Sequence, residues 1–133
     1  MAVRWYSVVV DCRDHRAQAA WWARVLGWRQ FHESDDEAVV LPPHFFDEGY
    51  FDRVPAHERG QGLVFVPVPE GKAVKNRLHL DLAPEGGDDH AAEVQRVIDL
   101  GARRVDVGQR DVPWVVLADP EGNEFCVLTP RDV

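Results

Sequence analysis

The chain has 133 residues, a length that fits one domain with its own hydrophobic core. It carries 23 acidic residues against 15 Lys and Arg, a formal net charge of −8, so nucleic acid and anionic membranes are not expected partners. Its two cysteines are too few for a disulfide framework, and its apolar runs are too short for a membrane span or signal peptide. We therefore expect a soluble cytoplasmic protein.

The first half of the sequence predicts a strand, a helix and two further strands. Residues 5–12 are rich in β-branched side chains, and residues 15–26 place apolar side chains at three- and four-residue spacing. Asp14 stands at the N-cap position of this helix, and Gly27 at its C-terminal stop. The two further strands are predicted at residues 37–41 and 63–68.

The second half repeats the order of the first. Residues 75–82 alternate leucines with polar residues, as a strand does, and a helix capped by Asp88 or Asp89 ends before Gly101. Three short strands are then predicted at residues 104–107, 114–118 and 124–128. The turn between the last two, at residues 119–123, contains a proline and a glycine suited to a hairpin.

This repetition predicts an α+β fold of two tandem β-α-β-β-β units, at about residues 3–68 and 77–129 of a single domain spanning 1–133. Each unit would form a curled mixed sheet with its helix outside, and the two sheets would surround a central cleft. The alternation in residues 77–82 would then place Leu78, Leu80 and Leu82 on the helix. Arg77, His79 and Asp81 would face the cleft.

Four features carry a family resemblance: the duplicated unit, the helix ends Leu26-Gly27 and Leu100-Gly101, the histidine in Arg77-Leu78-His79-Leu80-Asp81, and the turn Asp119-Pro120-Glu121-Gly122-Asn123. Together they resemble the vicinal oxygen chelate superfamily, which includes glyoxalases, extradiol dioxygenases, and bleomycin- and fosfomycin-resistance proteins. The resemblance covers about residues 3–129 and is strongest to uncharacterised glyoxalase-like domains. It implies a small-molecule ligand in the cleft and a homodimer.

Metal-using members of the superfamily place one ligand on the first and one on the last strand of each unit. The matching positions in this sequence are Ser7, Val64, His79 and Cys126. Only His79 and Cys126 offer ligand atoms, so we expect no catalytic metal and no cofactor. A set completed by Asp81 and Glu124 is an alternative, although these strand positions do not match the family geometry.

The candidate catalytic residues are His79 and Asp81, which would orient a ligand, while His79 could also transfer a proton near neutral pH. A nucleophilic triad with Ser7 is discounted, because side chains two residues apart on a strand point in parallel. For Cys126 a packing role as a small apolar side chain is the preferred alternative. The further expected ligand-binding residues are Ser7, Val64, Val66, Arg77, Trp114, Glu124, Cys126 and Phe46.

The function expected from these residues is glyoxalase-like binding of a small organic molecule without a catalytic metal, with His79 as acid or base in any reaction. A non-catalytic sequestering or resistance-type protein is the alternative, followed by a metal-dependent lyase or dioxygenase. The aromatic segment Pro42–Gly62 is long for a strand connection, which indicates a lid or a subunit contact. Together with the resemblance, it predicts a homodimer.

Overall fold

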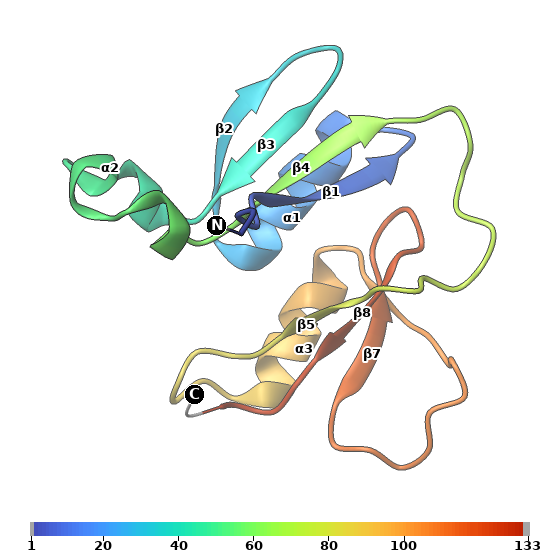
Figure 1. The fold of residues 1–133 in the computed structure, drawn as a ribbon. Helices are drawn as coiled ribbons and strands as arrows, with labels where there is room; N and C mark the ends of the chain where they lie inside the picture. The colour runs from blue at the N-terminus through green and yellow to red at the C-terminus, as the bar shows by residue number, and fades with distance from the viewer. Residues whose placement is uncertain (1, 132–133) are drawn as a thin grey trace. The chain divides into compact units, whose positions relative to one another are not determined.

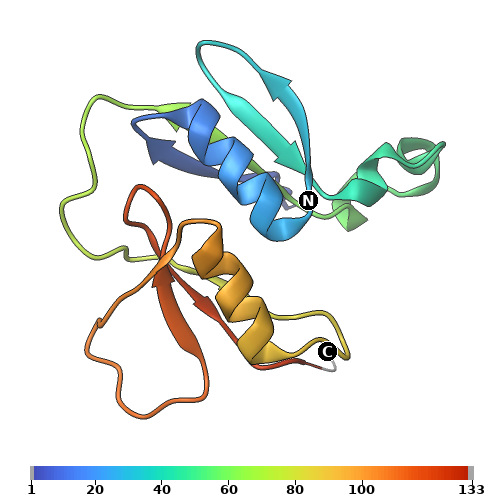
Figure 2. The same cartoon turned by 180° about the vertical axis from the view of Figure 1, so that it is seen from behind.

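The computed structural model describes residues 2–131, which form two compact units joined at Gly71 and Lys72. Each unit contains a four-stranded mixed sheet with a helix on one of its faces (Figure 1 and Figure 2). The α+β class and the two mixed sheets confirm the fold predicted from the sequence. No helix within residues 2–131 combines the length and the apolar character needed to cross a membrane.

In the first unit the strand order is β1-β4-β3-β2. The strands are β1 (Ser7–Cys12), β2 (Arg29–Glu33), β3 (Ala38–Leu41) and β4 (Gly62–Pro67), and the helix is α1 (His15–Leu26). β1 and β4 run parallel, whereas the other neighbours are antiparallel. Phe65 and Val40 are fully buried, and the adjacent Trp21 and Trp22 of α1 join them in the core. The core therefore lies between α1 and the sheet.

Helix α1 has the predicted bounds because its two ends carry strong signals. The Asp14 carboxylate accepts a hydrogen bond from the Ala17 amide at 3.1 Å. Gly27 takes a left-handed conformation with φ of 66°, which ends the helix. Strand β2 was not predicted, because all five of its residues are exposed and no alternation of buried and exposed side chains marks it.

The segment between β3 and β4 folds into three short helical turns, η1 (Pro43–Phe46), α2 (Tyr50–Arg53) and η2 (Ala56–Glu58). The rings of Phe45 and Tyr50 stack with centroids 4.9 Å apart, and both are buried. Phe51 stays 53% exposed. This aromatic segment thus buries part of its apolar surface within the first unit itself.

In the second unit the strand order is β5-β8-β7-β6. The strands are β5 (Leu80–Leu82), β6 (Arg103–Arg104), β7 (Val115–Ala118) and β8 (Glu124–Val127), and the helix is α3 (His90–Asp99). Asp89, rather than Asp88, caps the helix by accepting hydrogen bonds from two backbone amides. Leu117 and Phe125 are fully buried in the centre of the sheet. This unit repeats the arrangement of the first with shorter strands.

The first strand of the second unit is shorter than the sequence predicts, and the predicted place of Leu78 is wrong. The strand expected over 75–82 contains only Leu80–Leu82, and Leu78 is 89% exposed instead of packed on the helix. The parallel pairing of β5 with β8 begins at Leu80 and Phe125. Extending it would bring Leu78 to Asn123, but the amide of Asn123 donates to the Asp119 carboxylate in the turn. Leu78 therefore has no strand neighbour on that side.

Candidate functional site

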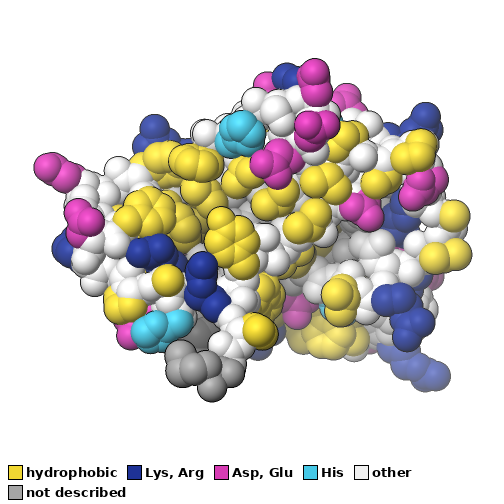
Figure 3. All heavy atoms as spheres, turned by 45° about the horizontal axis from the view of Figure 1, so that its top comes forward, with side chains coloured by type: hydrophobic (Ala, Val, Ile, Leu, Met, Phe, Trp, Pro, Cys, Tyr) yellow, Lys and Arg dark blue, Asp and Glu magenta, His cyan; other side chains and the backbone are white. Residues whose placement is uncertain are grey.

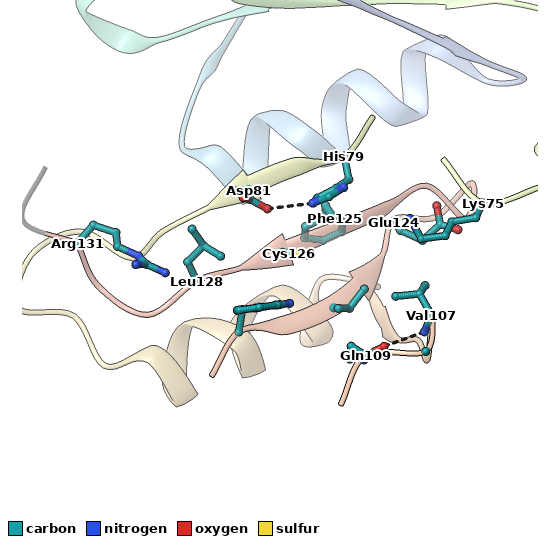
Figure 4. A pocket seen from close by; sticks show the side chains of 13 residues that line it. Lys75, His79, Asp81, Val107, Gln109, Glu124, Phe125, Cys126, Leu128 and Arg131 are labelled. Carbon is teal, nitrogen blue, oxygen red and sulfur yellow. Dashed lines mark hydrogen bonds and ion pairs between the residues drawn. The ribbon is translucent and has the colours of Figure 1, made fainter. Parts of the chain in front are cut away.

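The second unit contains a pocket of about 670 Å³ on its sheet (Figure 4). Strands β7 and β8, the residues around β5 and the loop that follows β6 supply its walls. Five of the residues expected to form the site line it: His79, Asp81, Trp114, Glu124 and Cys126. Trp114 is 37% exposed, so its ring belongs to the pocket wall rather than to the core.

His79, Asp81 and Cys126 converge at one point of this pocket. Asp81 and Cys126 are register partners on the parallel strands β5 and β8, and His79 precedes Asp81 by two residues. The imidazole Nε2 of His79 lies 3.5 Å from Oδ1 of Asp81 (Figure 4). One ligating atom from each of the three residues lies within 4.8 Å of the others. His79 stands just before the regular strand, and its ring approaches Asp81 rather than staying parallel to it.

The three side chains differ in their exposure and ionisation. The side chains of His79 and Asp81 are 46% and 50% exposed, whereas Cys126 is only 7% exposed. Burial, together with the negative charge of Asp81 and a hydrogen bond to it, raises the pKa of the Cys126 thiol above its usual value. Cys126 is therefore a protonated thiol at neutral pH and not a ready nucleophile.

Glu124 lines the pocket but has its own partners. One carboxylate oxygen lies 2.8 Å from the Lys72 ammonium, and the other accepts a hydrogen bond from the Asn76 amide at 3.0 Å. Burial alone would raise the pKa of Glu124, but these hydrogen bonds and the Lys72 charge outweigh it and lower the pKa to about 2. Through these two contacts, Glu124 holds residues 72–76 against strand β8.

A second pocket, of about 560 Å³, lies in the first unit. It contains Ser7 and Val64, beside the aromatic side chains of Trp5, Tyr6, Phe31, Phe45 and Phe51. Five of the eight expected ligand-binding residues are therefore divided between two pockets, three in the second unit and two in the first. The cleft expected between the units stays a prediction.

Three of the expected ligand-binding residues line neither of these two pockets, namely Phe46, Val66 and Arg77. The Arg29 guanidinium lies 4.3 Å from the centroid of the Phe46 ring, and the backbone carbonyl of Val66 accepts from the Cys12 thiol. Arg77 is exposed. Their strand or loop positions in the sequence do not reveal these local partners.

Several residues that line the pocket of the second unit were not predicted from the sequence. Val107 and Gln109 lie in the loop after β6, where the Gln109 amide group donates to the Val105 carbonyl and accepts from the Val107 amide. Arg131 follows β8. None of them stands in a motif, and a polar loop gives no sequence signal for its place beside a pocket.

The metal expectation can be tested against the side chains of the site. At the four family positions, Val64 has no ligating atom and Ser7 offers only a hydroxyl, so the set does not fit Mg²⁺ or Mn²⁺, which require several oxygen ligands. His79, Asp81 and Cys126 instead supply one nitrogen, one oxygen and one sulfur atom. That set fits a borderline ion such as Zn²⁺, because zinc binds all three ligand types.

Comparisons with known proteins assign this fold to a family. The glyoxalase-like domain family matches residues 7–128. No match was found among curated proteins. The fosfomycin resistance protein FosX from Listeria monocytogenes, crystallised with Mn(II) and sulfate, is similar with a TM-score of 0.68 at 10% identity over 99% of this chain and 94% of that chain.

Two further solved structures show the same fold. A glyoxalase/bleomycin resistance protein/dioxygenase family enzyme from Burkholderia phytofirmans PsJN has a TM-score of 0.67 at 17% identity over 97% of this chain and 100% of that chain. FosX from Mesorhizobium loti has a TM-score of 0.67 at 15% identity over 99% of this chain and 95% of that chain. The chain therefore belongs to the glyoxalase-like domain family of the vicinal oxygen chelate superfamily.

Proposed function

We propose that this protein binds a small organic molecule in the pocket of the second unit, with His79 and Asp81 as its polar anchors. The observation that carries the proposal is the pair itself: the two side chains lie 3.5 Å apart, are about half exposed, and line a pocket of about 670 Å³. A concave site with a few converging polar groups is the usual form of a small-molecule site.

The other pocket residues indicate the chemical class of the ligand. Trp114 offers an aromatic face for stacking, and Lys75 and Arg131 bring positive charge to the same walls. Glu124 adds little free negative charge, since Lys72 pairs with it. An aromatic metabolite fits these walls best, with any acidic group directed to Lys75 or Arg131 and a hydrogen-bond donor directed to Asp81.

Two readings of this function are separated by the fate of the bound compound. Similar structures carry the names of resistance proteins and of an oxidase, ChaP-H2, which supports small-molecule binding without selecting between sequestration and catalysis. A ligand recovered unchanged after prolonged incubation identifies a sequestering protein. A new product whose formation requires His79 identifies an enzyme.

The experiment is a thermal-shift screen of acidic and aromatic metabolites, with each hit incubated and analysed by mass spectrometry. It is carried out on chelator-treated protein, so that the organic ligand is tested without any metal ion. A hit that shifts the wild-type melting temperature but not that of His79→Ala supports the proposal. Hits that act equally on both proteins contradict it.

We also propose that the protein is a cytoplasmic homodimer with no affinity for nucleic acid. On the face in Figure 3, acidic, basic and hydrophobic side chains are mixed, and no extended basic area appears there. Trp5, Tyr6 and Phe31 of the first unit are 68%, 73% and 62% exposed, an apolar surface that a second copy of the chain can cover.

A further inference from the structure

We infer that the pocket of the first unit is a second binding site, one for an aromatic acid whose acidic group binds Arg4 and Arg59. The pocket has a volume of about 560 Å³, within the range of about 300–1,000 Å³ that small-molecule sites occupy. All of its wall residues belong to the first unit. It shares no residue with the pocket that contains His79 and Asp81.

Aromatic rings line the pocket of the first unit. Phe45 is buried, so its ring is a fixed part of the wall. Four further rings are each more than half exposed although they line the same pocket: Trp5, Tyr6, Phe31 and Phe51. Exposed rings of this kind lose apolar contact with water when a flat aromatic molecule lies against them. The walls therefore favour a ligand with an aromatic ring.

Arg4 and Arg59 bring two positive charges to these walls, and neither forms an ion pair with a carboxylate among residues 2–131. The half-buried Arg59 donates from Nε to the Val54 carbonyl at 3.0 Å and from Nη2 to the Phe51 carbonyl at 2.9 Å. These bonds fix the guanidinium but leave its charge and three of its five N–H donors free. A fixed guanidinium with free donors is well suited to bind a carboxylate.

The aromatic faces themselves indicate the sign of the ligand's charge. The Cζ atom of Arg4 lies 5.2 Å from the centroid of the Tyr6 ring, and that of Arg59 lies 4.9 Å from the centroid of the Phe51 ring. Each ring thus already has a cation of the protein on one face. A cationic ligand would be repelled by these two arginines, whereas an anionic group is attracted by both.

The single carboxylate among the described wall residues does not cancel this charge. Glu37 lies 3.8 Å from Nε2 of His32, which is also a wall residue. With His32 neutral, two arginines and one glutamate leave the pocket with a net positive charge, in a chain whose formal net charge is −8. Such a local excess of positive charge attracts anions.

This site does not depend on the proposed function, because it uses other residues and another unit. Its two anchors stand outside the regular strands, since Arg4 precedes β1 and Arg59 follows η2. Ser7 and Val64, which stand at superfamily positions, line the same pocket but have no charge with which to bind an acid. Arg59 belongs instead to the aromatic segment between β3 and β4.

The test is an NMR titration of full-length, isotope-labelled protein, followed through the indole N–H signals of Trp5 and Trp114. Trp5 lines the pocket of the first unit and Trp114 that of the second, so each pocket has its own reporter. The two signals are assigned with Trp5→Phe and Trp114→Phe. The probes are cinnamate and its neutral amide, cinnamamide. From the Trp5 signal we expect a Kd about tenfold lower for cinnamate, because charge-assisted hydrogen bonds are stronger than neutral ones.

Arg4→Gln and Arg59→Gln should each reduce this preference for cinnamate about fivefold. The preference is a ratio of two Kd values measured on one protein, so a change in the aromatic segment that weakens both probes equally does not alter it. The exposed side chain of Arg4 makes no hydrogen bond within residues 2–131, so Arg4→Gln leaves the fold intact. The control is Arg53→Gln, which removes an exposed arginine of α2 that lines neither pocket and should keep the preference.

Four results would overturn the proposed site. They are a Trp5 signal that does not shift with millimolar cinnamate while the Trp114 signal does or does not, equal Kd values for the two probes in the wild type, a preference retained in both Arg4→Gln and Arg59→Gln, and a preference lost equally in Arg53→Gln. The titration is repeated at a higher protein concentration, because the proposed homodimer uses the exposed rings of Trp5 and Tyr6. A Kd that rises with protein concentration would show that a second copy of the chain occupies the pocket in place of the acid.

Discussion

Asp81 and Cys126 lie opposite each other on strands β5 and β8, so that a carboxylate and a thiol meet on the pocket face of the second sheet. His79 completes the cluster from the residue before β5. The arrangement depends on the register between these two strands. A shift of one residue would turn Cys126 to the opposite face of the sheet and separate it from Asp81.

Glu124→Gln tests the anchor beside this cluster. The change removes the negative charge that faces Lys72, a contact in which the side chains of Lys72 and Glu124 are only 19% and 12% exposed. We expect the free energy of unfolding, measured with urea, to fall by about 1–3 kcal/mol.

The control is Glu58→Gln, whose carboxylate is 62% exposed and faces His57. It should change the free energy of unfolding by less than about 0.5 kcal/mol. Equal effects of the two substitutions would show that Glu124 is an ordinary surface residue.

Asp119→Ala tests the turn that leads into β8. The Asp119 side chain is 3% exposed and accepts hydrogen bonds from the backbone amides of Glu121 and Asn123 and from the Asn123 side chain. Leaving these donors without a partner should lower the free energy of unfolding by about 2 kcal/mol or more.

Asp106→Ala provides the comparison, because Asp106 accepts one turn amide, that of Gly108, at an exposed position. It should cost less than about 1 kcal/mol. If chemical denaturation shows that the two substitutions lower the free energy of unfolding by the same amount, the anchoring role of Asp119 is contradicted.

Sedimentation velocity at tens of micromolar tests the proposed homodimer. The expected species has twice the 15.1 kDa mass of one chain. The physical reason is the exposed aromatic surface of Trp5, Tyr6 and Phe31, which costs free energy in water unless a partner covers it. Replacing Phe31 with Ser should shift the equilibrium toward monomer, and a wild-type monomer at that concentration would refute the proposal.

Local signals in the sequence were sufficient to predict the two longer helices, α1 and α3. Residues 15–26 combine helical periodicity with a capping aspartate and a terminal glycine, and α1 has those same bounds. Strand β2 could not be predicted, because an exposed edge strand has no buried face to produce alternation.

The candidate site was predictable only in part. The polar positions His79 and Asp81 follow from strand alternation and do line the pocket. The pairing of Asp81 with Cys126 across the two strands, and the ion pair between Glu124 and Lys72, both join segments that are far apart in sequence. Such pairing is determined by tertiary packing, so no local sequence pattern predicts it.

The most direct test of the proposed function is the affinity of a ligand from the screen for three chelator-treated proteins: wild type, His79→Ala and His57→Ala. If His79 anchors the ligand, its removal should raise Kd about five- to hundredfold, the equivalent of about 1–3 kcal/mol, because a buried polar group of the ligand loses its partner. His57 lies 3.5 Å from the Glu58 carboxylate, the same distance as His79 from Asp81, but at an exposed position of the first unit. His57→Ala should therefore leave Kd unchanged. A Kd that is the same for all three proteins, or that rises equally in both variants, would contradict the account.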